Sequence, residues 1–161
     1  MSKYSYKKNA DYFKFYGARC EKLLFFPCAV DNEFLLKQAN SVDKKQLRLA
    51  YHIGAEDIVL LYVGQFIPRK NILTLLKAIK DLIDTGFLNI KLLLVGDGVQ
   101  KPELESFVQR NGLNQYVIFC GFKQSHKIYP FYAGASILIL PSYSDPSPKV
   151  INEAMNFGLP I

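Results

Sequence analysis

Apolar and polar residues follow two alternating patterns from residue 57 to the end of the chain. Short, almost wholly apolar runs are each followed by a stretch in which apolar residues recur at helical spacing. Such runs are typical of parallel strands that are covered on both faces. We therefore expect an α/β fold, with a doubly wound, mostly parallel sheet and helices on both faces. The expected strands are 58–63, 90–95, 116–120 and 137–141, and the expected helices are 71–84, 101–112, 126–135 and 149–158.

The stretch that begins at Asn71 gives the clearest helix pattern. Gly86 follows its last apolar position and is suited to ending a helix. Six apolar residues fall on one stripe of this helix, which is the arrangement of a helix packed on a core. They are Ile72, Leu75, Leu76, Ile79, Leu82 and Ile83.

Residues before position 57 give a less regular pattern. We expect a short aromatic-rich helix at 9–16, a strand at 22–26, a connecting loop at 27–34 and a helix at 42–51. The aromatic side chains of the first helix are too apolar to stand in water without partners. We interpret them as core residues, and the alternative is that they cover a second domain. They are Tyr12, Phe13, Phe15 and Tyr16.

Composition narrows the class of protein. Half of the 161 residues are apolar, which is enough for one domain with a real core. No apolar run approaches the roughly 20 residues that span a bilayer, and the N-terminus is unlike a signal peptide, so we expect a cytoplasmic protein. Three scattered cysteines, Cys20, Cys28 and Cys120, indicate reduced thiols. The net charge of +6 fits nucleic acid, an anionic membrane or a phosphorylated small molecule as a partner.

Cations stand at the expected starts of three of the helices. Arg69 and Lys70 precede the first, Lys101 precedes the second, and Lys149 lies in the opening turn of the last. A positive charge at this end of a helix costs about 0.3–1 kcal/mol unless an anion is bound there. Any one of these residues is readily explained as an ordinary solvated cation. Their recurrence after three of the four expected parallel strands predicts a site for phosphate or diphosphate.

The same loops leave alternatives open. Asp145 is a candidate for chemistry, but its carboxylate is equally suited to capping a helix, as is the hydroxyl of Ser147. The Gly-Asp-Gly sequence at 96–98 is not a dinucleotide-binding fingerprint. His52 and His126 lie far apart in sequence, so we assign no metal site.

Four segments carry a joint pattern: VGQFIPRKNILTLLKAI at 63–79, LLLVGDG at 92–98, VIFCGF at 117–122 and SILILPSYSDPSPKVINEAMNFGLPI at 136–161. Together they resemble the nucleotide-sugar-binding half of GT-B glycosyltransferases of the large retaining group, family four. The last segment keeps the family's two carboxylates with seven residues between them, here Asp145 and Glu153. PCAVDNEF at 27–34 resembles the segment that links the two domains of such enzymes.

The resemblance implies that a nucleoside-diphosphate sugar, UDP- or GDP-linked, binds between two domains. It also implies transfer of the sugar with retention, without a cofactor or a bound metal. By position, Asp145 is implied as the catalytic carboxylate near the donor sugar and Glu153 as the ribose-binding residue. The implied diphosphate contacts are Gly64, Gln65, Arg69, Lys70, Lys149 and Val150, and the implied base pocket is Gly96, Gly121 and Phe122.

Three departures from the family pattern leave the donor undetermined. Gln65 stands where the family usually has arginine, and Arg69 is the expected substitute. Asp145 is one methylene shorter than the usual glutamate. The segment 146–148, Pro-Ser-Pro, replaces a glycine-containing stretch and so offers fewer free amides to the donor.

We expect residues 1–34 to be the end of a preceding domain with its interdomain linker, and residues 35–161 to be an incomplete nucleotide-sugar-binding domain. As an isolated fragment the chain is then expected to bind nucleotide weakly and to transfer nothing, because it lacks the N-terminal acceptor domain. Expected partners are the donor and an unknown glycan or lipid-linked glycan, with peripheral contact to the inner face of the membrane left open and no nucleic acid. The alternative is a non-enzymatic basic α/β module that binds anionic lipid or nucleic acid.

Overall fold

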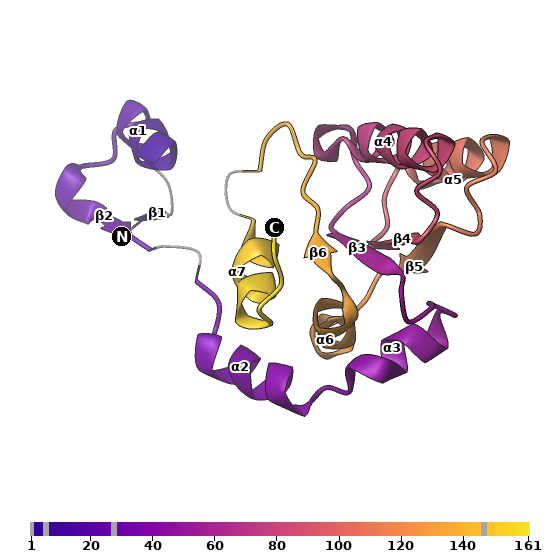
Figure 1. Cartoon of the computed structure of the whole chain (residues 1–161). Helices are drawn as coiled ribbons and strands as arrows, with labels where there is room; N and C mark the ends of the chain where they lie inside the picture. The colour runs from indigo at the N-terminus through magenta and orange to yellow at the C-terminus, as the bar shows by residue number, and fades with distance from the viewer. Residues whose placement is uncertain (1, 5–6, 27–28, 146–147) are drawn as a thin grey trace.

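Four parallel strands form the central sheet: β3 (Ile58–Val63), β4 (Ile90–Val95), β5 (Val117–Gly121) and β6 (Ile137–Leu138). The computed structural model of the chain describes residues 2–4, 7–26, 29–145 and 148–161 (Figure 1). The strands lie in the order β5-β4-β3-β6, and β3 pairs with both of its neighbours in parallel. The predicted parallel α/β sheet is confirmed.

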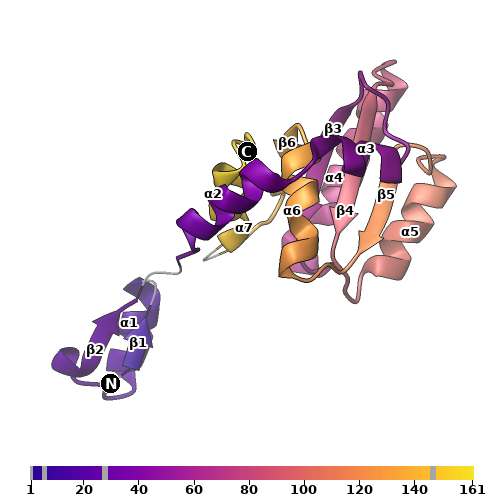
Figure 2. The ribbon, with the colours of Figure 1, turned by 90° about the horizontal axis from the view of Figure 1, so that it is seen from below.

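Helices cover both faces of this sheet: α3 (Lys44–Ala50), α4 (Ile72–Asp84), α5 (Lys101–Arg110), α6 (Ser125–Gly134) and α7 (Lys149–Asn156). In Figures 1 and 2, α4 and α5 lie on one face and α3 and α6 on the other. The helix predicted from Asn71 begins one residue later, and Gly86 follows its end with a φ of 90°. The sheet is therefore doubly wound, as the sequence predicts.

Two apolar cores lie on the two faces because successive side chains of a strand point in opposite directions. Val59 and Leu61 of β3 belong to the core that includes α3, α6 and α7. Leu60 and Tyr62 belong to the core that includes α4 and α5. All four side chains are buried. This burial on both faces explains why the strands are apolar throughout rather than at alternate positions.

The last strand is shorter than the apolar run at 137–141 predicts. β6 ends at Leu138, although the amide of Ile139 still donates to the Leu61 carbonyl at 2.8 Å. Pro141 has no N–H to continue such a ladder, and its carbonyl accepts from Asn71 Nδ2 at 3.2 Å instead. On the outer side of β6, the Leu138 amide donates to the carbonyl of Pro160 at 2.8 Å.

The predicted loop at 27–34 is wrong in its second half. Helix α2 (Asn32–Ser41) begins there, and the Asp31 side chain accepts a hydrogen bond from the Phe34 amide at 2.9 Å. The carboxylate thus satisfies one of the amides that a helix start leaves without a partner. Asp43 caps α3 in the same way, with its side chain accepting from the Lys45 amide at 2.9 Å.

Residues 2–4 and 7–26 form a small unit that lies apart from the main sheet in Figure 1. It contains β1 (Ser2–Tyr4), α1 (Lys7–Phe15), the 3₁₀ turn η1 (Cys20–Lys22) and β2 (Leu23–Phe25), and β1 pairs with β2 in parallel. The interpretation of its aromatic residues as core is wrong for Tyr12, Phe15 and Tyr16, which are 60%, 82% and 70% exposed. A two-stranded sheet is too small to bury that helix, and these rings contact one another instead.

None of the helices in the described part of the chain has the length and apolar character that a bilayer-spanning helix needs. Cys20 is exposed and Cys120 is buried, whereas Cys28 lies outside the described residues. Burial raises the pKa of the Cys120 thiol to about 11, so this thiol stays protonated near neutral pH and is a poor nucleophile.

Loops at the carboxyl ends of β3, β4 and β5 are joined backbone to backbone. The Gly64 amide donates to the Val95 carbonyl at 3.0 Å, and the Gly96 amide donates to the Gly121 carbonyl at 3.1 Å. A Cβ atom at Gly96 would lie 1.9 Å from the Gly64 carbonyl oxygen, and the φ of Gly96 is 150°. Only glycine fits at this position.

We predict that Gly96→Ala lowers the free energy of unfolding by about 3 kcal/mol, because the added methyl forces the two loops apart. Urea unfolding measures this change. Gly112→Ala is the matched control: Gly112 has a φ of 67°, but a Cβ there would meet nothing within 4 Å. It is expected to cost only about 1 kcal/mol. Equal losses in the two variants would contradict the role of close approach.

Candidate functional site

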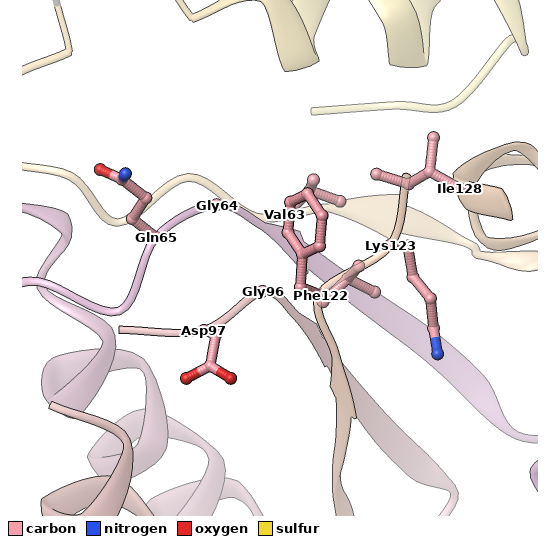
Figure 3. A pocket seen from close by; sticks show the side chains of 9 residues that line it. Val63, Gly64, Gln65, Gly96, Asp97, Phe122, Lys123 and Ile128 are labelled. Atoms are coloured by element: carbon pink, nitrogen blue, oxygen red, sulfur yellow. The ribbon is translucent and has the colours of Figure 1, made fainter. Parts of the chain in front are cut away.

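A cavity of about 300 Å³ opens at the carboxyl ends of β3, β4 and β5 (Figure 3). Ligands of open α/β sheets bind at this edge, and the volume lies at the lower end of the range for small-molecule sites. Most of its lining comes from the loops that follow the three strands. The lining residues are Val63, Gly64, Gln65, Val95, Gly96, Asp97, Phe122, Lys123 and Ile128.

Four of the residues implied by the family resemblance line this cavity: Gly64, Gln65, Gly96 and Phe122. The Phe122 ring is 72% exposed, and Figure 3 shows it between the side chains of Gln65 and Ile128. An exposed ring at the edge of a cavity offers a flat apolar face to a planar ligand such as a nucleobase. Gly121 does not line the cavity, but its carbonyl accepts from the Gly96 amide and holds that loop.

Two charged lining residues were missed at the sequence level, Asp97 and Lys123. Each is the second residue after a strand end, so the rule that ligands bind beyond the carboxyl ends of parallel strands was a signal for them. Asp97 Oδ2 lies 3.8 Å from Lys101 Nζ, and its Oδ1 accepts from the Gly98 amide at 2.7 Å. The carboxylate of Asp97 is therefore held within its own loop.

A second cluster joins the 3₁₀ turn η2 (Pro68–Lys70) to the segment 141–145. Lys70 is buried, at 8% exposed, and its Nζ forms an ion pair with Asp145. Arg69 Nη1 donates to the Ser144 carbonyl at 3.1 Å, and the Arg69 carbonyl accepts from the Tyr143 amide at 3.0 Å. The structure thus brings together the lysine predicted at the diphosphate and the carboxylate predicted at the donor sugar.

Tyr62 of β3 interacts with groups of both this cluster and the cavity. Its hydroxyl donates to the carbonyl of Gln65, a cavity residue, at 3.0 Å. Burial raises the pKa of Tyr62 well above its usual value, and the nearby Asp145 charge raises it further while Arg69 lowers it. The tyrosine therefore stays protonated and acts as a hydrogen-bond donor that fixes the loop after β3.

Carboxylates of the chain itself face two of the cations predicted at helix starts. Asp145 pairs with Lys70, and Lys101 Nζ lies 3.8 Å from Asp97 and 4.0 Å from Glu105. Lys149 differs, because it is exposed and forms no ion pair with any residue that the structure describes. Arg69 is also exposed and forms no ion pair with a described residue, but its side chain donates to the Ser144 carbonyl. Among these four cations, Lys149 is the one whose side chain has neither an ion pair nor a hydrogen bond with the described residues.

The Asp145 side chain does not cap α7, one of the two roles that the sequence left open for it. The N-cap of α7 is Pro148, with no side-chain cap hydrogen bond, and the Asp145 carboxylate pairs with Lys70 instead of capping the helix. Ser147 lies outside the described residues. Asn71 holds the N-cap position of α4 in a left-handed conformation, but its Oδ1 accepts from Thr74 Oγ1 at 2.7 Å rather than from a backbone amide.

Glu153 and Val150 lie on α7, apart from the cavity lining. Val150 is partly buried against the core, and Glu153 Oε2 accepts a hydrogen bond from the Tyr132 hydroxyl at 2.7 Å. Tyr132 was not a candidate at the sequence level, because an aromatic residue in a helix pattern is usually core. The predicted residues thus fall into three groups: the cavity, the cluster around Lys70, and the first turns of α7.

Metal chemistry finds no support in the described residues. No group of three His, Cys, Asp or Glu residues among them is placed to hold an ion. His52 and His126 are both exposed. The prediction that no metal is needed remains an expectation.

Comparison with known proteins identifies the family. The family described as Glycosyl transferases group 1 matches residues 43–161. The chain belongs to this family. Among the relatives of this group 1 chain, the uncharacterized glycosyltransferase MJ1607 of Methanocaldococcus jannaschii is 27% identical over 119 residues, 74% of this chain and 30% of the relative. The 2-deoxystreptamine glucosyltransferase of Streptomyces kanamyceticus is 29% identical over 146 residues, 90% of this chain and 37% of the relative.

Solved structures of GT-B glycosyltransferases resemble the group 1 chain in fold. WaaG, a glycosyltransferase involved in lipopolysaccharide biosynthesis, matches with a TM-score of 0.80 at 23% identity, over 98% of this chain and 42% of that one. Anabaena HepE, solved in complex with UDP, matches with a TM-score of 0.75 at 23% identity. The match covers 98% of this chain and 43% of HepE. The Rossmann-like half of a GT-B fold is confirmed. The chain spans about a third of the length of the curated relatives it matches.

We predict that Lys70→Met lowers the free energy of unfolding by about 3 kcal/mol, because it leaves the largely buried Asp145 carboxylate without its partner. Lys70→Met combined with Asp145→Leu is expected to recover most of that loss. A double-mutant cycle by urea unfolding measures the coupling.

The control for this cycle is Lys80→Met, which breaks the exposed pair between Lys80 and Asp84 and is expected to cost less than about 0.5 kcal/mol. If the losses in free energy of unfolding at Lys70 and Asp145 are additive, the ion pair does not stabilise the contact between η2 and the segment 141–145.

Proposed function

We propose that this chain supplies the donor-binding part of a glycosyltransferase that uses a UDP- or GDP-linked sugar. The observation that carries the proposal is the cavity beyond β3, β4 and β5, with the exposed Phe122 ring at its edge. Its position matches where open α/β sheets bind nucleotides. Family membership supports the same function, as do the structures of HepE solved with UDP and with UDP-glucose.

In this proposal the base lies against Phe122, between the loops that contain Gly96 and Gly121. The ribose hydroxyls bind Glu153, because a carboxylate accepts two hydrogen bonds at once. The diphosphate lies at the remaining polar groups at the carboxyl edge and at the start of α7. These are Gly64, Gln65, Arg69, Lys70, Lys149 and the backbone of Val150.

Lys70 and Asp145 serve the donor as a pair. An ammonium group has three N–H donors, so Lys70 can hold Asp145 and a phosphate oxygen at the same time. Asp145 is thereby fixed beside the bond that breaks, as the catalytic carboxylate. The cations stabilise the charge that develops on the departing diphosphate, a role that preorganised donors fill without a metal ion. We propose that the sugar is transferred with retention to a glycan or lipid-linked glycan acceptor.

A non-enzymatic basic module remains the alternative function. The net charge of +6 favoured it at the sequence level, but the total charge does not identify a partner. Family membership favours the transferase.

We predict that UDP or GDP shifts the backbone amide signals of cavity residues such as Gly64 and Gly96 in an NMR titration of this chain. Lys149→Ala is expected to weaken binding about 5-fold and Glu153→Ala about 10-fold, as expected for the loss of charge-assisted hydrogen bonds. Lys77→Ala removes an exposed lysine on α4 and should change affinity less than about twofold. Failure of both nucleotides to bind rejects the donor site; unchanged affinity in the first two variants rejects their roles.

A polypeptide that joins this chain to an acceptor-binding domain is expected to form a product with the anomeric configuration of the donor. The chain alone is expected to release no more nucleotide from a UDP- or GDP-sugar than buffer does, because it spans only about a third of the length of the curated glycosyltransferases it matches. Proton NMR of the first product formed reports the configuration through its anomeric coupling. An inverted product would reject retention, and transfer by the chain alone would reject the need for a second domain.

A further inference from the structure

The hydroxyl of Tyr132 is a buried polar group that the proposed function has not yet used. Tyr132 is 1% exposed, and its hydroxyl donates to Glu153 Oε2 at 2.7 Å. Burial raises the pKa of Tyr132 far above its usual value, and the charge of Glu153 raises it further. The hydroxyl therefore keeps its proton at any physiological pH and acts as a permanent donor to this carboxylate.

The ring that carries this hydroxyl is held rigidly. Tyr132 lies on α6 in the core between the sheet and α7, and its ring centroid is 5.5 Å from that of Phe157. A tyrosine side chain has few rotatable bonds, and burial removes the remaining freedom. Glu153 is different, because it lies on the eight-residue helix α7 and is only partly buried. The rigid Tyr132 side chain thus fixes the more flexible Glu153 side chain.

Only one carboxylate oxygen of Glu153 accepts the hydrogen bond from Tyr132. Its Oε1 accepts no hydrogen bond from the residues that the structure describes, whereas Oε2 is held by Tyr132. A carboxylate with one oxygen fixed cannot rotate freely about its last bond, so the direction of the other oxygen is set before a ligand arrives. Holding a binding group in its bound orientation in advance increases affinity, because less freedom is lost on binding.

We propose that Tyr132 is a positioning residue that holds Glu153 so that its carboxylate meets the hydroxyl groups of a ligand ribose. This inference rests on the proposed donor-binding function and deepens it. Tyr132 does not touch the nucleotide; it acts through Glu153. Its effect is therefore specific to the ribose hydroxyls and does not extend to the base or the diphosphate.

The test compares the dissociation constants of a nucleotide and its 2′,3′-dideoxy form, measured by NMR titration of the 161-residue chain with UDP or GDP. The unsubstituted chain is expected to prefer the ribonucleotide about 10-fold, as one charge-assisted hydrogen bond provides. In Tyr132→Phe, which keeps the ring and removes the hydroxyl, the preference is expected to fall to about twofold. A merely structural role would weaken both ligands equally and leave the ratio unchanged.

Tyr129→Phe is the matched control. Tyr129 lies on the same helix, is 7% exposed and stacks on the same Phe157 ring at 5.8 Å. Its hydroxyl makes no hydrogen bond to the described residues, so its removal should leave the ribose preference at about 10-fold. Glu153→Ala should lower the preference as far as Tyr132→Phe does. Tyr132→Phe should then add nothing in the Glu153→Ala background.

The outcomes separate this inference from the function on which it rests. If the unsubstituted chain binds neither nucleotide, the proposed function falls, and the inference falls with it. If it binds with a ribose preference that Tyr132→Phe leaves intact, only the inference is overturned. A preference lost equally in Tyr129→Phe also overturns it, because the effect would then come from the aromatic packing and not from the hydroxyl.

Discussion

Direct packing of one backbone on another is the constraint on which the rest of the site depends. Parallel strands end at one edge of the sheet, so the loops after β3, β4 and β5 meet there and exchange hydrogen bonds between main-chain atoms. No side chain separates Gly96 from the Gly64 carbonyl. The side chains of Gln65, Asp97 and Phe122 are thereby placed around one cavity. The positions of these three side chains therefore depend on the backbone contact between Gly96 and Gly64, in which the side chains themselves take no part.

The pattern of apolar and polar residues predicted most of the fold, but it missed helix α2 and gave the wrong length for the last strand. The strands of the sheet were predictable because burial on both faces makes a run wholly apolar. Helix α2 was missed because its face is weakly apolar: Leu35 is buried, but Phe34 and Leu36 are 46% and 50% exposed. The strand 137–141 was overestimated because composition does not show where pairing stops: β6 ends at Leu138.

The candidate site was predictable residue by residue but not in its connections. Lys70 and Asp145 were each chosen from their place after a strand, yet their ion pair joins residues 75 positions apart in sequence. Tyr132 gave no signal, because its hydroxyl matters only when Glu153 lies beside it. The argument from helix dipoles treated cations as isolated charges. In the folded chain Lys70 and Lys101 have carboxylate partners, and such partners reduce what a helix start alone reveals about ligands.

The hydrogen bond from the Leu138 amide to the Pro160 carbonyl has a consequence for self-association. Edge strands with free donors and acceptors are templates on which another molecule can add a strand. At the β6 side of the sheet the Leu138 amide is already paired with a carbonyl of the same chain. The β5 side is the other margin of the sheet. Addition of a strand from another copy of this chain is therefore more hindered at β6, where this amide is occupied, than at β5.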